Sequence, residues 1–237
     1  VPKVKILRKW DLQYDMITVA IRNSRMTDWN QGDFKGVIAA CNVAERQCIE
    51  MANRFGDDIL YSALDELLER NCRAMRQLIM DTIPEEKQTF EDYICDDALG
   101  GGPYKIRCSM WREDEIVIFD FDGTDPQSPG SINFLMNEEM FKMFCGTFMI
   151  SAFDPQILFN DGFYDYIDVR IPDGCLLKPN RPAALSCRTH ALGRIFDVLS
   201  GLLGQGNPDF LCGAGFSDSP HFMYSGHDKN GEWYQLY

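Results

Sequence analysis

The stretch YKIRCSMWREDEIVIFDFDGTDPQ, residues 104–127, decides the fold of this chain. Residues 104–111 and 115–121 are rich in β-branched and aromatic side chains, and three polar residues separate them. Two short strands with so short a connection most simply form an antiparallel hairpin. The segment 122–131 that follows is rich in Gly, Pro, Asp and Ser, so a loop is expected there.

The chain before this stretch has a helical pattern. Apolar residues keep helical spacing over residues 11–23, after a short strand or extended arm in the first ten residues. A turn is expected over residues 27–32, and a long helix from Asp33, which can act as its N-cap.

A further helix is expected over residues 57–82. Gly56 fits the C-terminal cap of the helix before it, and Pro84 cannot continue the helix itself. The two long helices are predicted to form an αα-hairpin joined at Gly56.

After the central hairpin the sequence predicts helices over residues 137–152 and 192–203 and a strand over residues 164–171. The predicted fold class is α+β. A helical N-terminal third is followed by a mixed, partly antiparallel β-sheet with packed helices. We expect a helical region at residues 1–88 and a mixed α/β region at residues 89–237, together one segment of a larger subunit.

Composition limits the functional classes. The net charge of −13 would repel a nucleic-acid backbone, so nucleic acid is not expected as a partner. No apolar run reaches the roughly 18 residues that a membrane helix needs. The nine cysteines show no C-x-x-C spacing and are expected to be reduced, which favours a cytoplasmic protein.

One motif points to a phosphatase. Residues 116–124, IVIFDFDGT, resemble the first motif of haloacid-dehalogenase-like phosphatases, in which Asp120 would be the nucleophile and Asp122 the general acid and base. That family places the motif on a central parallel strand near the start of the chain. Here the strand is expected in an antiparallel hairpin, so a tight turn over residues 122–126 is the preferred interpretation.

A second resemblance covers most of the chain. Residues 119–133, FDFDGTDPQSPGSIN, resemble the hydantoinase B segment DFTGTDPQ…GPIN. Further blocks of that family follow in the same order, and the residues similar to them are 31–41 with 44–46, 90–97, 160–163 with 167–179, 181–184 and 193–199. Residues 185–190 depart from the family pattern. The family includes oxoprolinase B-halves and the large subunits of acetone and acetophenone carboxylases.

The resemblance implies a function. The chain would be part of the B-type subunit of an ATP-dependent cyclic amide hydrolase, acting on a small-molecule substrate. Its partners would be an ATP-binding A-type subunit and the remainder of the B-type subunit in a hetero-oligomer. The divalent metal and ATP would belong to the whole complex, and no cofactor is expected to be bound by this chain itself.

The catalytic residues are left open, and four polar residues are the candidates for a substrate cavity. Asn133 follows a Gly-containing loop, and His190 lies just before a predicted helix. Asn160 and Asp161 belong to an Asn-Asp-Gly turn that would present polar groups. No metal site is predicted, because His221 and His227, with Asp218 and Asp228 nearby, most simply lie in a surface loop.

Three alternatives remain at this point. The chain would be part of an ATP-dependent ketone carboxylase, a non-catalytic assembly module, or the phosphatase that uses Asp120 and Asp122.

Overall fold

The structure is a computed structural model that describes residues 4–9, 11–24, 26–185, 187–211, 213, 215 and 223–236. The chain divides into two compact units, residues 1–65 and 66–237. The boundary falls inside one helix. The predicted domain boundary between residues 88 and 89 lies one residue inside the strand Gln88–Ile94, and as a domain boundary it stays a prediction.

The first unit begins with a small strand pair and a short helix. Strands β1 (Leu7–Arg8) and β2 (Asp11–Leu12) are antiparallel, and helix α1 (Tyr14–Arg22) follows and packs on the next helix. The helix predicted from residue 11 therefore starts later, because residues 11 and 12 pair with the preceding strand.

Helix α2 (Thr27–Phe55) is longer than predicted. The prediction of a turn at residues 27–32 is wrong, because the helix already begins at Thr27. For the same reason Asp33 is not its N-cap. Asp28 in the first turn suits the positive end of the helix dipole. Gly32 inside a helix costs only about 1 kcal/mol, which the following turns offset.

Helix α3 (Asp57–Thr82) has the predicted bounds. Gly56 caps α2 with a φ of 85°, a conformation that favours glycine. The αα-hairpin stays a prediction, and the one-residue connection argues against it, since such hairpins use loops of about two to five residues.

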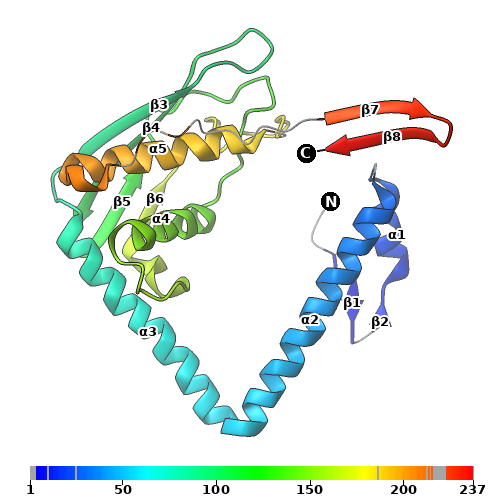
Figure 1. Ribbon diagram of the computed structural model, residues 1–237. Helices are drawn as coiled ribbons and strands as arrows, with labels where there is room; N and C mark the ends of the chain where they lie inside the picture. Colours follow the sequence, from blue (N-terminus) through cyan, green and yellow to red (C-terminus); the bar gives the residue numbers. More distant parts are fainter. Residues whose placement is uncertain are drawn as a thin grey trace. The chain divides into compact units, whose positions relative to one another are not determined.

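The centre of the second unit is a four-stranded mixed sheet (Figure 1) in the order β3-β4-β5-β6. Strands β3 (Gln88–Ile94), β4 (Tyr104–Glu113) and β5 (Ile116–Asp120) are antiparallel neighbours. The predicted hairpin is thereby confirmed. Asp114 in its turn has a φ of 52°, as the favoured two-residue hairpin turns require. Strand β6 (Ile167–Arg170) pairs parallel with β5.

Two helices cover one face of this sheet (Figure 1). Helix α4 (Glu138–Phe153) matches its prediction and is capped by Asn137, whose side chain accepts from the Met140 N–H at 2.8 Å. Helix α5 (Arg188–Gly206) starts four residues before its predicted beginning. The predicted strand 164–171 is partly wrong, because residues 161–166 form the 3₁₀-helix η1 (Asp161–Tyr166).

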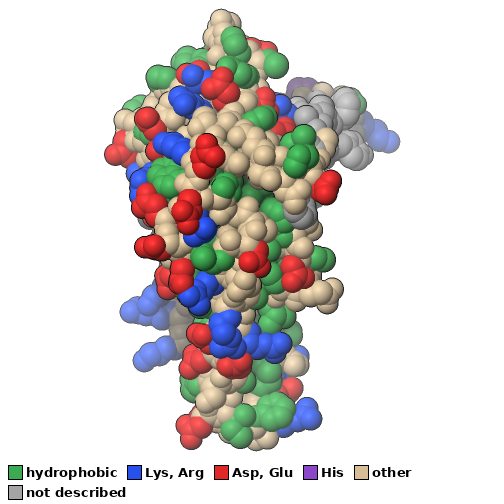
Figure 2. Space-filling model, turned by 90° about the vertical axis from the view of Figure 1, so that its left-hand side faces the viewer, with side chains coloured by type: hydrophobic (Ala, Val, Ile, Leu, Met, Phe, Trp, Pro, Cys, Tyr) green, Lys and Arg blue, Asp and Glu red, His purple; other side chains and the backbone are tan. Residues whose placement is uncertain are grey.

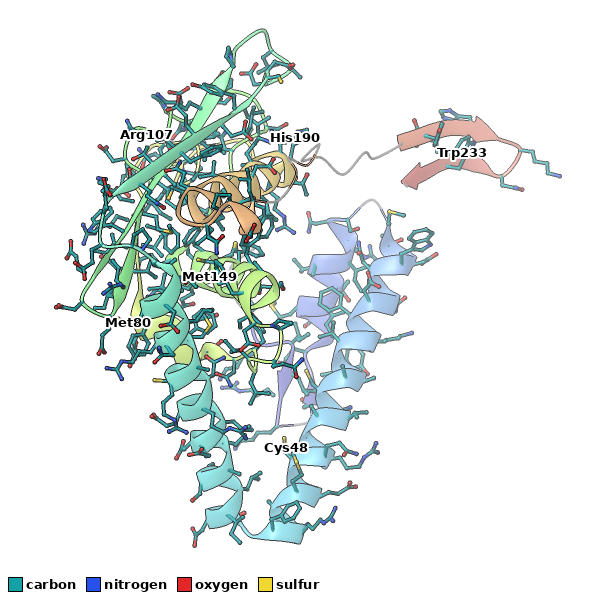
Figure 3. The ribbon with its side chains drawn as sticks, turned by 60° about the vertical axis from the view of Figure 1, so that its left-hand side comes forward. Cys48, Met80, Arg107, Met149, His190 and Trp233 are labelled. Atoms are coloured by element: carbon teal, nitrogen blue, oxygen red, sulfur yellow. The ribbon has the colours of Figure 1, made fainter. Side chains whose placement is uncertain are left out.

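The remaining elements follow α5. They are the 3₁₀-helix η2 (Pro208–Phe210) and an antiparallel hairpin of β7 (Met223–Asp228) and β8 (Gly231–Leu236), which carries Trp233 (Figure 3).

The core lies between the sheet, the C-terminal half of α3, and α4 and α5. Phe141 of α4 meets Phe119 and Phe121 in edge-to-face contacts, with ring centroids 5.2 and 5.1 Å apart. All three rings are fully buried. Aromatic pairs of this kind add about 0.5–1.5 kcal/mol to the free energy of area burial.

Charged groups are mixed on the surface. On the face drawn in Figure 2, acidic and basic side chains alternate with apolar ones, without a large patch of one sign. In the part of the chain that the structure describes, no helix has the length and apolarity to cross a membrane.

We predict that Phe141→Ala lowers the free energy of unfolding by about 3–5 kcal/mol, because it leaves a cavity under two rings. Denaturant unfolding measures this. The control Tyr61→Ala removes an aromatic ring that is 67% exposed, and it should change stability by less than about 0.5 kcal/mol. Equal effects of the two variants would contradict this core.

Candidate functional site

Three loops meet beside the N-terminal end of α5. One joins β3 to β4 (residues 95–103), a second covers residues 127–136, and the third, which leads into α5, includes residues 184, 185 and 187. Buried polar side chains tie these loops together.

Asp97 is the centre of this network and is only 3% exposed. Its Oδ1 accepts from the backbone N–H groups of Leu99 and Gly101, both at 2.9 Å. Its Oδ2 accepts from the hydroxyls of Tyr104 and Ser128, both at 2.8 Å. These donors hold the pKa of Asp97 well below its ordinary value, the Leu99 N–H and the Ser128 hydroxyl most of all.

Two glycines allow this close approach of backbone segments. A Cβ at Gly130 would lie 2.5 Å from the carbonyl oxygen of Asp97. Gly102 has a φ of 133°, and its Cβ would collide with the Cys95 carbonyl oxygen. The clear Gly-rich break in the sequence is therefore required by geometry.

Asn133 holds the second loop in place. It is fully buried; its Oδ1 accepts from the Ser128 N–H at 2.8 Å, and its Nδ2 donates to the carbonyls of Ser128, Gly130 and Ala184. A side chain with all these bonds has little capacity left for a ligand. We therefore assign Asn133 to the support of the site.

A cavity of about 390 Å³ lies in front of this network. Its size is in the range of small-molecule sites. His190 and Arg194 of α5 line it together with the end of β3 and all three loops. The lining residues are Tyr93, Ile94, Cys95, Asp96, Asp97, Ala98, Ser131, Ile132, Cys187, His190 and Arg194.

His190 is the predicted candidate that lies in this cavity. It is in the first turn of α5 (Figure 3), not before the helix, because α5 begins at Arg188. The backbone N–H of His190 donates to the Cys187 carbonyl at 3.2 Å. The Ser131 hydroxyl in turn donates to the Cys187 sulfur at 3.5 Å, which joins the second and third loops.

Arg194 was not singled out from the sequence. Its guanidinium bonds to Asp92 of β3 at 2.8 Å and to Asp197 at 3.0 Å, and its Nη2 donates to the Gly215 carbonyl. The arginine thus reaches the cavity with its charge already balanced. The sequence could have indicated Arg194, because it lies four residues after His190 and therefore on the same face of a helix. Its ion pair with Asp92 could not be foreseen, since the two residues are 102 positions apart in the chain.

Asn160 and Asp161 lie elsewhere. Asn160 caps η1, accepting from the Gly162 N–H at 2.9 Å, and donates to the Leu67 carbonyl of α3 at 3.0 Å. Asp161 lies in the first turn of η1. Neither residue is in the described lining of the cavity, so the structure does not bring all four candidates together.

No group of three or more potential metal ligands occurs among the described residues. His221 and Asp218 lie outside them. His227 on β7 contacts Glu232 on β8 at 3.0 Å across the hairpin.

The phosphatase-like motif has a structural role. After β5 ends, the Thr124 hydroxyl both accepts from the Arg107 N–H and donates to the Arg107 carbonyl. The Asp125 carboxylate accepts from the Lys105 N–H at 2.8 Å. The Asp120 carboxylate accepts from the Asp122 N–H at 3.0 Å, as in a tight turn. Side chains of this segment thus continue the pairing with β4, where Arg107 lies (Figure 3).

Comparison with protein families gives a match over the whole chain. The family model described as hydantoinase B/oxoprolinase matches residues 1–237. The beta subunit of caprolactamase from Pseudomonas jessenii is 27% identical over 232 residues, 96% of this chain and 39% of that protein. A putative B-type subunit of D-/L-hydantoinase from Pseudomonas sp. strain NS671 is 23% identical over 237 residues, 94% of this chain and 38% of that protein.

Two solved structures share the fold. The crystal structure of ATP-dependent caprolactamase from Pseudomonas jessenii matches with a TM-score of 0.86 and 24% identity, over 99% of this chain and 40% of that one. A nucleotide-free acetone carboxylase structure matches with a TM-score of 0.82 and 18% identity, over 100% of this chain and 33% of that one. This chain thus spans well under half the length of these relatives.

We predict that Asp97→Asn destabilises the protein at neutral pH, since the amide cannot accept all four hydrogen bonds. The pKa of Asp97 is depressed in the folded state, so its contribution is present above the unfolded pKa of about 3.9 and is lost as pH falls below it. The difference in denaturation midpoint between wild type and variant should therefore shrink in acid. Asp96→Asn, at an exposed neighbour, should have little effect, and a pH-independent difference for Asp97→Asn would contradict this assignment.

Proposed function

The chain belongs to the hydantoinase B/oxoprolinase family, and on that premise we propose that it forms part of the B-type subunit of an ATP-dependent cyclic amide hydrolase. The resemblance found in the sequence is thereby confirmed at the level of the family. The observation that carries the reaction type is the 27% identity, over 96% of this chain, to one subunit of a caprolactamase. The proposal includes an A-type subunit that binds ATP and phosphorylates the amide oxygen, which makes the ring easier to open.

We propose that the 390 Å³ cavity beside α5 receives the substrate. Two charged groups at its wall are occupied, because Asp97 accepts four hydrogen bonds and Arg194 is paired with Asp92 and Asp197. The third, the exposed Asp96, accepts from the Ala98 N–H and would repel an anionic ligand. Burying a ligand charge against such a wall would cost free energy without a new partner. A neutral ring with a polar amide therefore suits the cavity better than a nucleotide.

The metal and ATP of the proposed complex would be bound outside the described residues. These residues offer no set of three metal ligands, and the sequence holds no G-x-x-x-x-G-K-[ST] phosphate loop. No step through the metal is therefore assigned to this chain. Its proposed part is to bind and orient the substrate, with His190 as the polar contact.

Carboxylation of a small ketone is the second candidate. A ketone is also neutral, and the fold shared with acetone carboxylase supports this alternative. If the chain is instead a non-catalytic assembly module, it would have the same fold and bind partner subunits, but the complex would convert no substrate. The motif on which the phosphatase rests already has another role, in pairing with β4.

We also propose a cytoplasmic location, since the complex would require ATP. The cysteines for which the structure describes the sulfur are all free thiols, which fits a reducing compartment.

To test the proposal, the native complex is purified by means of an affinity tag on this chain, and its enzymatic activity is measured. Hydrolysis of ATP that depends on caprolactam, a hydantoin or oxoproline, with ring-opened product, would support the proposal. Dependence on acetone and bicarbonate would support the carboxylase instead. A lone chain that releases phosphate from esters with Mg²⁺ would favour the phosphatase, and a complex without turnover the assembly module.

We predict that His190→Ala raises the KM for the ring substrate by roughly 2–10-fold, because the substrate loses one hydrogen bond to the cavity wall. Steady-state ATP hydrolysis at varied substrate concentration measures it. His227→Ala, on the exposed hairpin, is the matched control and should leave the KM unchanged. Identical kinetics for both variants would remove the cavity from consideration as the substrate site.

A further inference from the structure

A second cavity, of about 200 Å³, lies between α3 and the segment that links α4 to η1 (Figure 1). It is distinct from the cavity beside α5, because the two share no described lining residue. Its volume is below the usual range of small-molecule sites, so it suits a ligand of few heavy atoms. The lining residues are Arg70, Asn71, Ala74, Asp154, Gln156, Ile157 and Leu158.

Hydrogen bonds hold the two walls of this cavity together. The Nδ2 of Asn71 on α3 donates to the Leu158 carbonyl in the opposite wall. A few residues further along, Asn160 donates to the Leu67 carbonyl of α3 at 3.0 Å. The segment after α4 is therefore fixed against the helix, and the cavity belongs to the packed structure of this unit.

One buried polar atom at this cavity has no partner. Asn71 is only 1% exposed, and the bond of its Nδ2 to the Leu158 carbonyl fixes which way its amide points. Its buried Oδ1 accepts no hydrogen bond from the residues that the structure describes. A buried acceptor without a donor costs free energy, and an N–H group of a bound ligand would remove that cost.

Opposite charges line the same cavity. Arg73, three residues after Arg70, pairs with two glutamates of its own helix. Arg70 and Asp154 form no such salt bridge within the described part of the chain, either with each other or with another group. The Asp154 carboxylate accepts from the Gln156 N–H at 3.0 Å, which fixes its position in the wall. The cavity thus offers one cationic group and one anionic group to a ligand.

We propose that this cavity binds the zwitterion of a small amino acid. Its carboxylate is bound by Arg70 and its ammonium group by Asp154, while one ammonium N–H donates to the Oδ1 of Asn71. A ligand with both charges gives each of the three side chains a partner, which a neutral amide or a simple anion does not. Because both charged side chains are exposed, the affinity is expected to be low.

The two cavities would have complementary roles under the proposed function. Hydrolysis of a lactam breaks the amide bond and leaves a carboxylate and an amine on one carbon chain, which is a zwitterion at neutral pH. The cavity beside α5 would receive the neutral ring, and the second cavity would bind a molecule of the product class. This relation rests on the proposed function, whereas the binding of an amino acid does not.

The first experiment measures binding to the native complex by calorimetry without ATP, so that no turnover is needed. The probes are glycine, γ-aminobutyrate and ε-aminocaproate, which differ in the separation of their charges. Each is compared with the amine and the carboxylic acid of the same carbon chain. At least one amino acid should bind more tightly than both of its analogues. If none does, the proposal is overturned.

The second experiment locates the binding. Arg70→Gln and Asp154→Asn should each weaken the binding of the best amino acid by roughly 2–5-fold, the size of an exposed ion pair. Asp154→Asn should leave the binding of the matching carboxylic acid unchanged. The control Arg73→Gln removes an exposed arginine of the same helix outside the described lining, and it should have no effect. Equal affinity in all three variants would overturn the site.

The third experiment tests the buried acceptor without a substitution in the core. The N-trimethyl derivative of the best amino acid keeps both charges but has no N–H group. It should bind at least roughly fivefold more weakly, since the Oδ1 of Asn71 stays unpaired. The N,N-dimethyl derivative keeps one N–H and controls for the added bulk. Equal losses for the two derivatives would remove Asn71 from the proposed site.

Discussion

The hydrogen bonding of one buried carboxylate, that of Asp97, is the constraint on which the candidate site depends. Taking a carboxylate out of water is costly unless donors replace the lost hydration. Asp97 has four donors, two from the turn of its own loop, one from β4 and one from the next loop. The geometry of three chain segments is thus fixed by the need to keep one group charged.

The same principle recurs around the cavity. Asn133 bonds to its own loop and to residue 184, and Arg194 bonds to two carboxylates. Thr124 and Asp125 replace backbone partners along β4. Polar groups that would recognise a charged ligand are therefore engaged in holding the walls. Such a cavity is preorganised, which is the basis for the proposal that it receives a small neutral molecule.

The fold is shared with enzymes that are 24% and 18% identical in sequence, which shows how few identities the core needs. Those proteins are much longer than this chain. Under the proposed function, chemistry that requires ATP and a metal would belong to a larger assembly, in which this chain would supply a supported cavity.

The sequence by itself determined the local elements and the family. The hairpin of β4 and β5, the bounds of α3, the helix at residues 137–152 and the order of the family blocks all depend on residues close together in the chain. The sequence did not predict the start of α2 or the 3₁₀-helix η1. At α2 the turn-forming residues of segment 27–32 gave a stronger local signal than the helical pattern, and at η1 a strand was expected from residue 164. Only the tertiary structure separated the four candidates. It placed His190 in the cavity, Asn133 among the bonds that hold the loops, Asn160 against α3 and Asp161 in the first turn of η1. The reason is that a polar side chain takes its role from its hydrogen-bond partners. In this protein many of those partners lie 30 to 100 residues away along the chain. Ser128 with Asp97 and Arg194 with Asp92 are two examples.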